Sequence, residues 1–216
     1  MKITMLKRSF DILISVAGLF ALLPFFLLVA VWIKVDSRGP VWYRGLRIGR
    51  GGMPFRIFKF RTMVVNADKL GGPSTSDDDP RITRVGRFLR KYKLDELPQL
   101  VNVLKGEMSF VGPRPEVQMY VDLYSEEEKV ILSVRPGITD WASLWNPDEG
   151  AILAGSPDPE KTYREEIRPQ KIRLQLEYVR RRSLGVDLQI MLKTLAVVLS
   201  RAESPAVKAL GEKGGV

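Results

Sequence analysis

The longest apolar run of the chain lies near its N-terminus. Residues 12–33 read ILISVAGLFALLPFFLLVAVWI, without a charged side chain. At about 1.5 Å per residue, a helix of this length can cross the ~30 Å hydrocarbon core of a bilayer. A secretory signal peptide fits poorly, because its apolar core is usually about 7–15 residues long and no small-x-small cleavage site follows before Lys34. The pattern therefore predicts a membrane segment that is retained.

Two features favour a re-entrant hairpin (helix, break, helix) over a simple crossing. Pro24 sits near the middle of the segment, where it deletes a backbone donor and clashes with the preceding turn. Basic residues flank both ends, whereas a crossing leaves one end poor in Lys and Arg; they are Lys2, Lys7, Arg8, Lys34, Arg38, Arg44, Arg47 and Arg50. The alternative is a single tilted, Pro-kinked transmembrane helix. We assign residues 1–36 to a re-entrant membrane anchor and residues 37–216 to a cytosolic catalytic domain with helices at the membrane interface.

The rest of the pattern predicts a mostly helical α+β domain with a small β-hairpin. Residues 41–48 and 55–62 are β-prone and are joined by the Gly-rich stretch 49–52. Helical signals are more numerous. A short basic helix is N-capped by Thr83 and runs to Lys91, a second covers residues 96–104 and stops at Gly106, and a third is indicated by the spacing of Val117, Tyr120, Val121 and Tyr124. A capping box at Ser125–Glu128 opens a helix that ends before Pro136, and further helices are predicted from the spacing of Ile172, Leu176 and Val179 and over residues 186–199.

Two regions are predicted as loops, and the last helix has two interpretations. Residues 74–79 are polar, and residues 141–169 are rich in Pro, Gly and Asp without a clear period. Residues 186–199 are apolar enough either to enter the core or to lie flat on a membrane. No internal repeat, low-complexity tract or interdomain linker is visible.

The composition limits which side chains could carry out catalysis. The 216 residues suit one domain with a sizeable core, and the absence of Cys and His excludes disulfides, Cys/His zinc sites, Ser-His triads and an imidazole base. Carboxylates, Lys, Arg, hydroxyls and a hard metal ion remain. A net charge of +9 predicts an anionic partner. Residues 34–70 are strongly basic and interleaved with aromatics, so beside a membrane segment they predict a surface facing lipid phosphates rather than nucleic acid.

The adjacent carboxylates of Asp95 and Glu96 are the strongest candidates for catalysis. They follow a stretch from Arg81 to Lys93 that contains basic residues and no acid, and Pro98 suits the first turn of a helix. Two such carboxylates can divide the work, one attacking phosphorus and the other holding Mg²⁺ through oxygen. Mg²⁺ is needed because a carboxylate and a diphosphate otherwise repel each other. An ordinary N-cap Asp followed by a Glu at the helix start is the simpler alternative.

Three further motifs carry weaker signals. Arg114 stands between two prolines, which suits a bidentate phosphate clamp or an ordinary surface turn. Lys59 and Arg61 alternate with aromatics, so they are expected on one strand face, lining an anionic pocket or facing solvent. Residues 77–79 are three consecutive Asp, which are more often solvated than metal-binding. No Walker-type GxxxxGK[ST] or dinucleotide-binding GxGxxG motif is found where it would be needed.

Taken in order, these motifs resemble the bacterial sugar transferases, the monotopic polyprenyl-phosphate phosphoglycosyl transferases. The resemblance covers nearly the whole chain and rests on Lys7-Arg8 with Asp11, the apolar segment with Pro24, Lys59–Met63, Asp79-x-Arg81-x-Thr83, Leu94–Gln99, Gly106–Ser109, Val111–Pro115, Arg135–Thr139 and the tail from Tyr178 to Thr194. Leu23 departs from the pattern, because many relatives carry Ser before the proline. The chain looks like the minimal catalytic core of the family.

The resemblance implies an enzyme at the cytoplasmic face of the bacterial inner membrane. It would move a sugar-1-phosphate from a UDP-sugar to undecaprenyl phosphate and release UMP, the first membrane step of glycoconjugate biosynthesis. By the same resemblance Asp95 would attack the β-phosphorus in a covalent ping-pong route and Glu96 would bind Mg²⁺. The remaining phosphate-binding candidates are Arg114, Lys59, Arg61 and Arg90. A homodimer is compatible with the sequence, which does not fix the oligomeric state.

Two rival functions stay open at this point. A non-catalytic, membrane-bound basic adaptor would use residues 34–70 to recruit anionic lipids or partners. An Asp-based sugar-nucleotide phosphohydrolase would act through Asp95 without needing the lipid. Residues 141–169 are the stretch expected to help shape the sugar pocket, and they carry no readable signal for a particular sugar.

Overall fold

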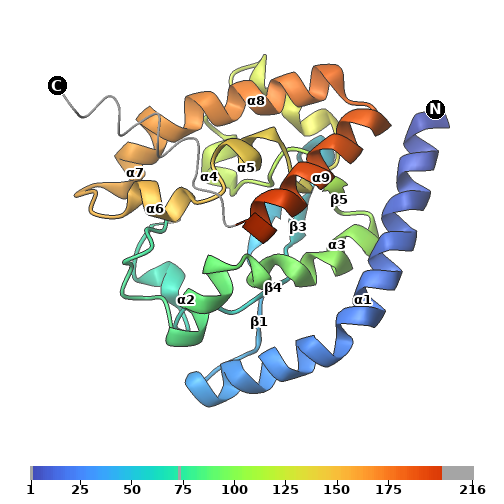
Figure 1. Ribbon diagram of the computed structural model, residues 1–216. Coiled ribbons are helices and arrows are strands. Elements are labelled where there is room, and N and C mark those ends of the chain that lie inside the picture. The colour runs from blue at the N-terminus through green and yellow to red at the C-terminus, as the bar shows by residue number, and fades with distance from the viewer. Residues whose placement is uncertain (1, 73, 201–216) are drawn as a thin grey trace.

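The structure is a computed structural model that describes residues 2–72 and 74–200, and it confirms a mostly helical α+β fold (Figure 1). The α-helices are α1 (Lys2–Asp36), α2 (Arg84–Lys91), α3 (Leu100–Lys105), α4 (Gln118–Val121), α5 (Trp141–Trp145), α6 (Glu149–Leu153), α7 (Pro159–Thr162), α8 (Arg168–Arg181) and α9 (Leu184–Ser200). Short 3-10 turns are η1 (Arg50–Gly52), η2 (Ala67–Lys69), η3 (Leu94–Gln99) and η4 (Glu128–Ser133), and η5 (Tyr163–Ile167) is a π-helical turn.

The strands form three two-stranded pairs. They are β1 (Trp42–Tyr43) antiparallel to β4 (Lys59–Phe60), β2 (Leu46–Ile48) antiparallel to β3 (Pro54–Arg56), and β5 (Ser109–Val111) parallel to β6 (Gly137–Thr139). The predicted hairpin is therefore present as β2–β3, but each predicted long strand is divided in two. The side chain of Asn102 in α3 explains the interruption after β3, because its Oδ1 accepts the N–H of Phe58 and its Nδ2 donates to the carbonyl of Arg56.

The apolar N-terminal segment forms one long helix, α1, which bends near its middle (Figure 1). The predicted break at Pro24 is thus a bend within a continuous helix, the usual effect of proline in a helix interior. Residues 5–36 are long and apolar enough to cross a membrane by length and composition. The outward face of α1 carries exposed apolar side chains, among them Leu13, Phe20, Leu28, Val31 and Val35.

The second half of α1 belongs to the core of the protein. Phe26, Val29 and Ile33 are buried against one another and against side chains of β4 and α2, namely Phe60, Val85 and Leu89. Leu94 and Leu97 of η3 pack on this same cluster. Burial of such side chains contributes roughly 1.5–3 kcal/mol each, so this half of the helix is held by apolar packing.

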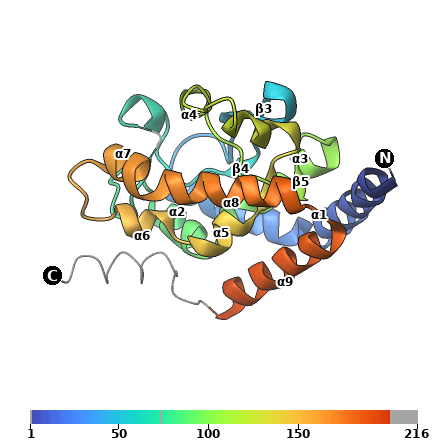
Figure 2. The same cartoon turned by 90° about the horizontal axis from the view of Figure 1, so that it is seen from above.

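The first half of α1 is held by polar side chains. The Lys7 ammonium donates to the Asp187 carboxylate at 2.7 Å and to the Tyr178 hydroxyl at 3.0 Å, which ties α1 to α8 and α9. Arg8 donates to carbonyls at the end of α3, and Asp11 accepts from Ser109 Oγ in β5 at 3.2 Å. The two views together show α9 meeting α1 on the N-terminal side of the bend (Figure 2).

Several predicted helix boundaries are confirmed. The hydroxyl of Thr83 accepts the N–H of Gly86 and caps α2, and Gly106 ends α3 with a left-handed φ of 82°. The capping box is also present, since Ser125 and Glu128 exchange hydrogen bonds, although the turn that follows is a 3-10 helix. The predicted helix from residue 96 is instead split into η3 and α3.

The prediction of a patternless loop over residues 141–169 is wrong. The region contains the three short helices α5, α6 and α7, followed by η5. Each of the three helices follows an Asp whose carboxylate accepts the backbone N–H three residues later; these are Asp140, Asp148 and Asp158. The Asp residues that suggested a loop are the N-caps of helices too short to show a period.

Candidate active site

The acid pair lies on the 3-10 turn η3, against strand β4. Lys93, just before η3, adopts a left-handed conformation with φ 55°, and the turn begins after it. Leu94 and Leu97 face the apolar cluster around α1. Because these two side chains are fixed in the apolar layer, the intervening Asp95 and Glu96 are directed to the polar side of the turn, where β4 presents Lys59.

Glu96 is held by two cations. Lys59 Nζ lies 2.7 Å from Glu96 Oε1, and Arg114 Nη1 donates to Oε2 at 3.0 Å while Nη2 contacts Oε1. The Arg114–Glu96 contact is therefore bidentate, the strongest common geometry for such a pair. Asp95 is placed differently, because Lys59 Nζ is 4.0 Å from its Oδ2. The side chains of both acids are largely buried, with exposed fractions of 8% for Asp95 and 12% for Glu96.

The pKa values of the two adjacent carboxyl groups are shifted in opposite directions. Burial raises the pKa of Asp95, and the charge of Lys59 offsets this only in part. Burial also acts to raise the pKa of Glu96, but Arg114 and Lys59 outweigh it and hold that pKa well below its usual value. Burial lowers the pKa of Lys59 against the attraction of Glu96, and Glu96 raises the pKa of Arg114. Glu96 is thus a firmly paired anion, whereas Asp95 is a buried acid with little direct stabilisation of its charge.

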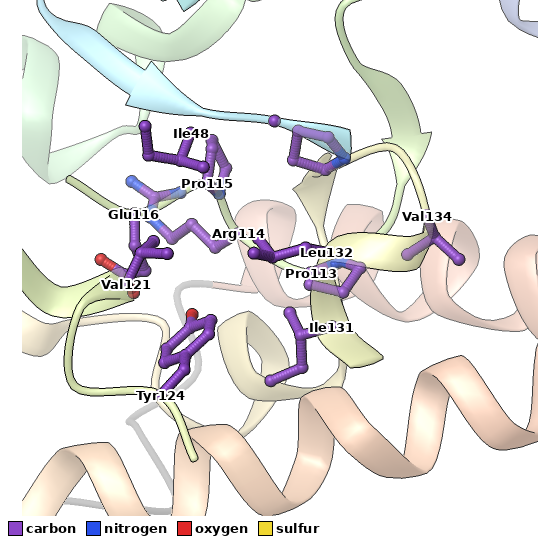
Figure 3. Close-up of a pocket in the computed structure, with 12 residues that line it drawn as sticks. Ile48, Pro113, Arg114, Pro115, Glu116, Val121, Tyr124, Ile131, Leu132 and Val134 are labelled. Carbon is purple, nitrogen blue, oxygen red and sulfur yellow. The ribbon is translucent and has the colours of Figure 1, made fainter. Parts of the chain in front are cut away.

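The loop that carries Arg114 is rigid. Gly112 N donates to Thr139 O at 3.1 Å and Gly137 N donates to Pro113 O at 3.0 Å. A Cβ on Gly137 would lie 2.1 Å from the Gly112 nitrogen, so the two backbones approach too closely for any side chain there. Arg114 and its neighbouring prolines line a narrow crevice together with Ile48, Glu116, Val121, Tyr124 and Ile131 (Figure 3).

The structure brings three of the predicted cationic residues toward the acid pair and places the fourth elsewhere. Lys59 and Arg114 contact Glu96 directly. Arg90 is half-buried in α2, and its charge acts to lower the pKa of Asp95. Arg61 is buried at the end of α1, where it donates to the Ser37 carbonyl at 2.8 Å, to the Ser37 hydroxyl and to the Arg38 carbonyl.

The expectation that Lys59 and Arg61 share one strand face is therefore corrected. Strand β4 ends at Phe60, so the two-residue alternation does not extend to Arg61, which turns to the carbonyls that follow α1. A phosphate-binding role for Arg61 stays a prediction, and its contacts in the structure hold the chain that leaves the anchor.

The run of Asp residues at 77–79 is not simply solvated. Asp79 is buried and forms a bidentate contact with Arg81, whose Nη2 lies 2.6 Å from Asp79 Oδ2. The raised pKa of Asp77 results from burial and from the nearby Asp148. Asp79 therefore fixes the loop ahead of α2, and among residues 2–72 and 74–200 no cluster of three or more His, Cys, Asp or Glu could hold a metal ion.

Sequence reasoning missed a buried ion pair behind Arg114. Lys171 Nζ lies 2.7 Å from Glu116 Oε1 and 3.6 Å from Glu149 Oε2, and it also donates to the Tyr163 hydroxyl. Glu116 and Glu149 further raise the pKa of Arg114. The pair joins α8 to the segment after β5, and no local spacing signals it because the partners are far apart in the sequence.

The acid pair suits Mg²⁺ by the chemistry of its donors. Carboxylate oxygens are ligands that Mg²⁺ prefers, and the ion is commonly held by one or two carboxylates together with substrate phosphates and water. Asp95 and Glu96 supply two carboxylates and the described residues gather no third at this place. The residues therefore fit an ion that arrives with a diphosphate rather than one caged by protein alone.

Fold and site together define a protein in which a buried acid pair is held by a lysine and an arginine, beside an apolar helix with an exposed face. Comparison with known proteins identifies the family. The sequence profile of the bacterial sugar transferases matches residues 2–201, and the chain belongs to this family.

Curated relatives extend over most of this chain. The UDP-N-acetylgalactosamine-undecaprenyl-phosphate N-acetylgalactosaminephosphotransferase of Aeromonas hydrophila is 38% identical over 198 residues, covering 90% of this chain and 44% of the relative. The exopolysaccharide production protein ExoY of Sinorhizobium fredii is 40% identical, covering 90% and 86%. The UDP-glucose:undecaprenyl-phosphate glucose-1-phosphate transferase of Escherichia coli is 36% identical, covering 88% and 39%. The chain thus spans less than half of the first and third relatives and most of ExoY.

Proposed function

We propose that this protein transfers a sugar-1-phosphate from a UDP-sugar to undecaprenyl phosphate, forming the undecaprenyl diphosphate sugar and UMP. The observation that carries the proposal is the acid pair, in which Glu96 is fixed by Lys59 and Arg114 while Asp95 has no such bidentate partner among residues 2–72 and 74–200. The names of the Aeromonas and Escherichia relatives, which specify transfer to undecaprenyl phosphate, support the same reaction.

In the proposed reaction Asp95 is the nucleophile. A carboxylate oxygen of Asp95 forms a bond to the sugar-bearing β-phosphorus, and the bond from that phosphorus to the bridging oxygen breaks, so the leaving group is UMP. An oxygen of undecaprenyl phosphate then attacks the same phosphorus and displaces the Asp95 carboxylate. Atoms balance over the two steps, and charge develops on phosphoryl oxygens, which the nearby cations can stabilise.

Glu96 is the residue proposed to hold Mg²⁺. When bound, the ion would neutralise diphosphate charge and so let a carboxylate approach phosphorus. Within the described residues, Oε1 of Glu96 accepts from both Lys59 and Arg114, whereas Oε2 accepts only from Arg114 Nη1, so Oε2 keeps a lone pair that could bind the ion.

A re-entrant arrangement of α1, at the cytoplasmic face of the bacterial inner membrane, completes the proposal. Lys7, near one end of α1, pairs with Asp187, and Ile33, near the other end, packs against side chains of β4 and α2. Both ends of α1 therefore contact the rest of the folded chain. A helix that crossed the bilayer would place these two contacts on opposite sides of the membrane. The bend at mid-helix lets both ends stay on one side (Figure 1), which supports the re-entrant arrangement.

The pathway served would be glycoconjugate synthesis, and the similarity to ExoY favours an exopolysaccharide. The test is UMP release by the full chain in detergent or nanodiscs, with Mg²⁺, across a panel of UDP-sugars, with and without undecaprenyl phosphate. UMP that requires the lipid and is absent from Asp95→Asn is the expected result. A phosphosugar adduct on the wild type, seen by intact mass when the lipid is withheld, would identify the covalent step.

Three outcomes would overturn the proposal. Sugar phosphate released to water at the same rate without lipid would establish a phosphohydrolase. Full turnover by Asp95→Asn would remove Asp95 as the nucleophile. Absence of any UMP or adduct with every UDP-sugar, from a folded protein, would favour the basic adaptor.

A further inference from the structure

A second basic cavity lies apart from the acid pair. Its volume is about 260 Å³, and its lining includes Arg50, Phe55, Gly106, Glu107 and Arg135, from η1, β3, the end of α3 and the segment before β6. None of the acid-pair residues or their two cationic partners lines it. A water molecule takes about 30 Å³ in the liquid, so the cavity has ample room for a hydrated phosphate group.

Arg135 and the neighbouring Arg8 are positioned by backbone carbonyls rather than by carboxylates. Arg135 Nε donates to the Gly106 carbonyl at 2.8 Å. Arg8, on the other side of Gly106, donates to the Val103 and Leu104 carbonyls at 2.6 and 2.8 Å. Within the described chain, none of the ion pairs involves Arg8, Arg50 or Arg135.

The charges around the cavity do not cancel. The carboxylates nearby are those of Glu107 and Asp11, and each is engaged by a neutral donor: Asn102 Nδ2 lies 2.7 Å from Glu107 Oε2, and Ser109 Oγ lies 3.2 Å from Asp11 Oδ1. Of the charged side chains that line the cavity, the guanidinium groups of Arg50 and Arg135 stand against the single carboxylate of Glu107, and Arg8 adds a further positive charge behind Gly106. In keeping with this, burial and the like charges of Arg50 and Arg8 lower the pKa of Arg135.

From this cavity and its unbalanced charge we infer a phosphate-binding site, formed by Arg50 and Arg135 with Arg8 behind them. A phosphodiester carries the single negative charge that would neutralise the excess, and a guanidinium presents paired donors that match phosphate oxygens. Two ligands share this chemistry: the headgroup of an anionic membrane phospholipid, and free phosphate. The headgroup is within reach because Arg8 follows the exposed apolar residues Met5 and Leu6 of α1.

The shape of the neighbouring turn leaves the cavity open. Gly51 and Gly52 in η1 have positive φ values of 70° and 76°, and a Cβ on either would have no heavy atom within 4 Å. This turn joins β2 to β3, and its Arg50 lies in the lining of the cavity. The inference stands independently of the proposed catalytic reaction, since it uses none of the residues assigned to that reaction.

The first experiment measures whether phosphate stabilises the full chain in detergent. The Tm of the wild type is compared in sodium phosphate and in sodium chloride of equal ionic strength, because a ligand that binds only the folded state raises Tm. The rise in Tm is expected for the wild type and for Asp95→Asn, and is expected to be lost in Arg50→Gln and Arg135→Gln. The matched control is Arg56→Gln, which removes a neighbouring exposed arginine of β3 that contacts only the Arg44 carbonyl in the described chain.

The second experiment identifies the source of the phosphate group. The same proteins are taken from nanodiscs of phosphatidylcholine with and without phosphatidylglycerol, and retained lipid is counted by native mass spectrometry. Retained phosphatidylglycerol in the wild type that is lost in Arg50→Gln assigns a lipid headgroup; a phosphate-dependent Tm without retained lipid assigns free phosphate.

Two results would overturn the inference. In the first, Arg50→Gln and Arg135→Gln keep the full phosphate response of the wild type. In the second, the wild type shows neither the response nor retained phosphatidylglycerol. If Arg135→Gln loosens the end of α3, Arg50→Gln still tests the inference, because the side chain of Arg50 is exposed and, among the described residues, has no hydrogen bond to an α3 carbonyl.

Discussion

The fully buried carboxylate of Asp140 holds the backbone of Arg114. Arg114 N lies 3.2 Å from Asp140 Oδ2, which also accepts Gln175 Nε2, while Asp140 Oδ1 accepts Ser143 N at 2.7 Å and so caps α5. Pro113 and Pro115, on either side of Arg114, have no N–H group. Within residues 113–115, the N–H of Arg114 is therefore the backbone donor that Asp140 can hold. Asp140 thus links the cap of α5 to the arginine that contacts Glu96.

Replacing Asp140 is expected to weaken both stability and turnover. Asp140→Ala removes an N-cap and the partner of a buried N–H, at a cost of about 1–3 kcal/mol in the free energy of unfolding. Turnover should fall further than stability explains, because Arg114 loses its backbone support. Asp158→Ala is the matched control, since it removes the cap of α7 without contacting Arg114. Equal UMP release rates in the two variants would show that Asp140 does not position Arg114.

Glu96→Gln is expected to weaken the Mg²⁺ dependence of the reaction together with its rate. The amide keeps the size of the side chain but loses the negative charge that pairs with Lys59 and Arg114 and that would attract the metal. The measurement is UMP release as a function of Mg²⁺ concentration. Glu160→Gln serves as the control, because that acid contacts Tyr120 and Ser74 instead. A Glu96→Gln curve that coincides with the wild type would exclude Glu96 as the ligand.

The buried Glu116–Lys171 pair predicts a pH window of stability. Burial acts to raise the pKa of Glu116, yet Lys171 outweighs it and lowers that pKa, so its contribution is present above the ordinary Glu value and is lost as pH falls through the lowered one. Burial opposes the charge of Lys171, but Glu116 and Glu149 raise its pKa well above the ordinary value. The stability that Lys171 contributes is therefore complete below the ordinary Lys pKa and is lost as pH rises through the raised pKa.

Glu116→Gln should therefore destabilise the protein at neutral pH, by up to about 3–5 kcal/mol, because it leaves a buried ammonium with only the more distant Glu149. The variant should also lose less stability than the wild type as pH falls from 5 to 3. Tm measured across this range tests both expectations. Glu126→Gln breaks an exposed ion pair and should change stability by less than about 1 kcal/mol. A wild-type acid transition that Glu116→Gln reproduces unchanged would contradict the assignment.

Pro24→Ala is expected to straighten α1 and shift part of the population toward a membrane-spanning helix. Because the chain contains no Cys, Ser9→Cys and Arg38→Cys give single reporters on either side of the apolar run. With Pro24 present, both should react with an impermeant maleimide from the cytoplasmic side of sealed inverted vesicles. In Pro24→Ala, one of the two cysteines should become inaccessible to the maleimide in part of the molecules. Labelling identical to that with Pro24 would show that the proline does not set the topology.

The parts of the fold that local chemistry determines could be predicted from the sequence. Thr83 and Gly106 bound their helices through capping groups close in sequence, and the Gly-rich stretch 49–52 joins β2 to β3. The charge pattern around Asp95 and Glu96 predicted a site rich in cations, and Lys59 and Arg114 do converge on Glu96 from other elements.

The remaining features depend on contacts that no local pattern encodes. Lys171 meets Glu116 only because α8 packs beside the segment after β5, and Arg61 leaves the site only because β4 stops one residue before it. The Asp residues that cap the helices over residues 141–169 give this stretch the composition of a loop. Its helices of four or five residues are also too short to display periodicity.

The packing of η3 on α1 fixes the acid pair relative to the apolar helix. Leu94 and Leu97 flank Asp95 and Glu96 in sequence and touch the cluster formed by Phe26, Val29 and Ile33. In the proposed re-entrant arrangement, the depth to which α1 enters a bilayer would therefore also set the level of Asp95. Removing residues 1–36 to obtain a soluble fragment would strip the support from beneath η3, and the fragment would lose the site along with its anchor.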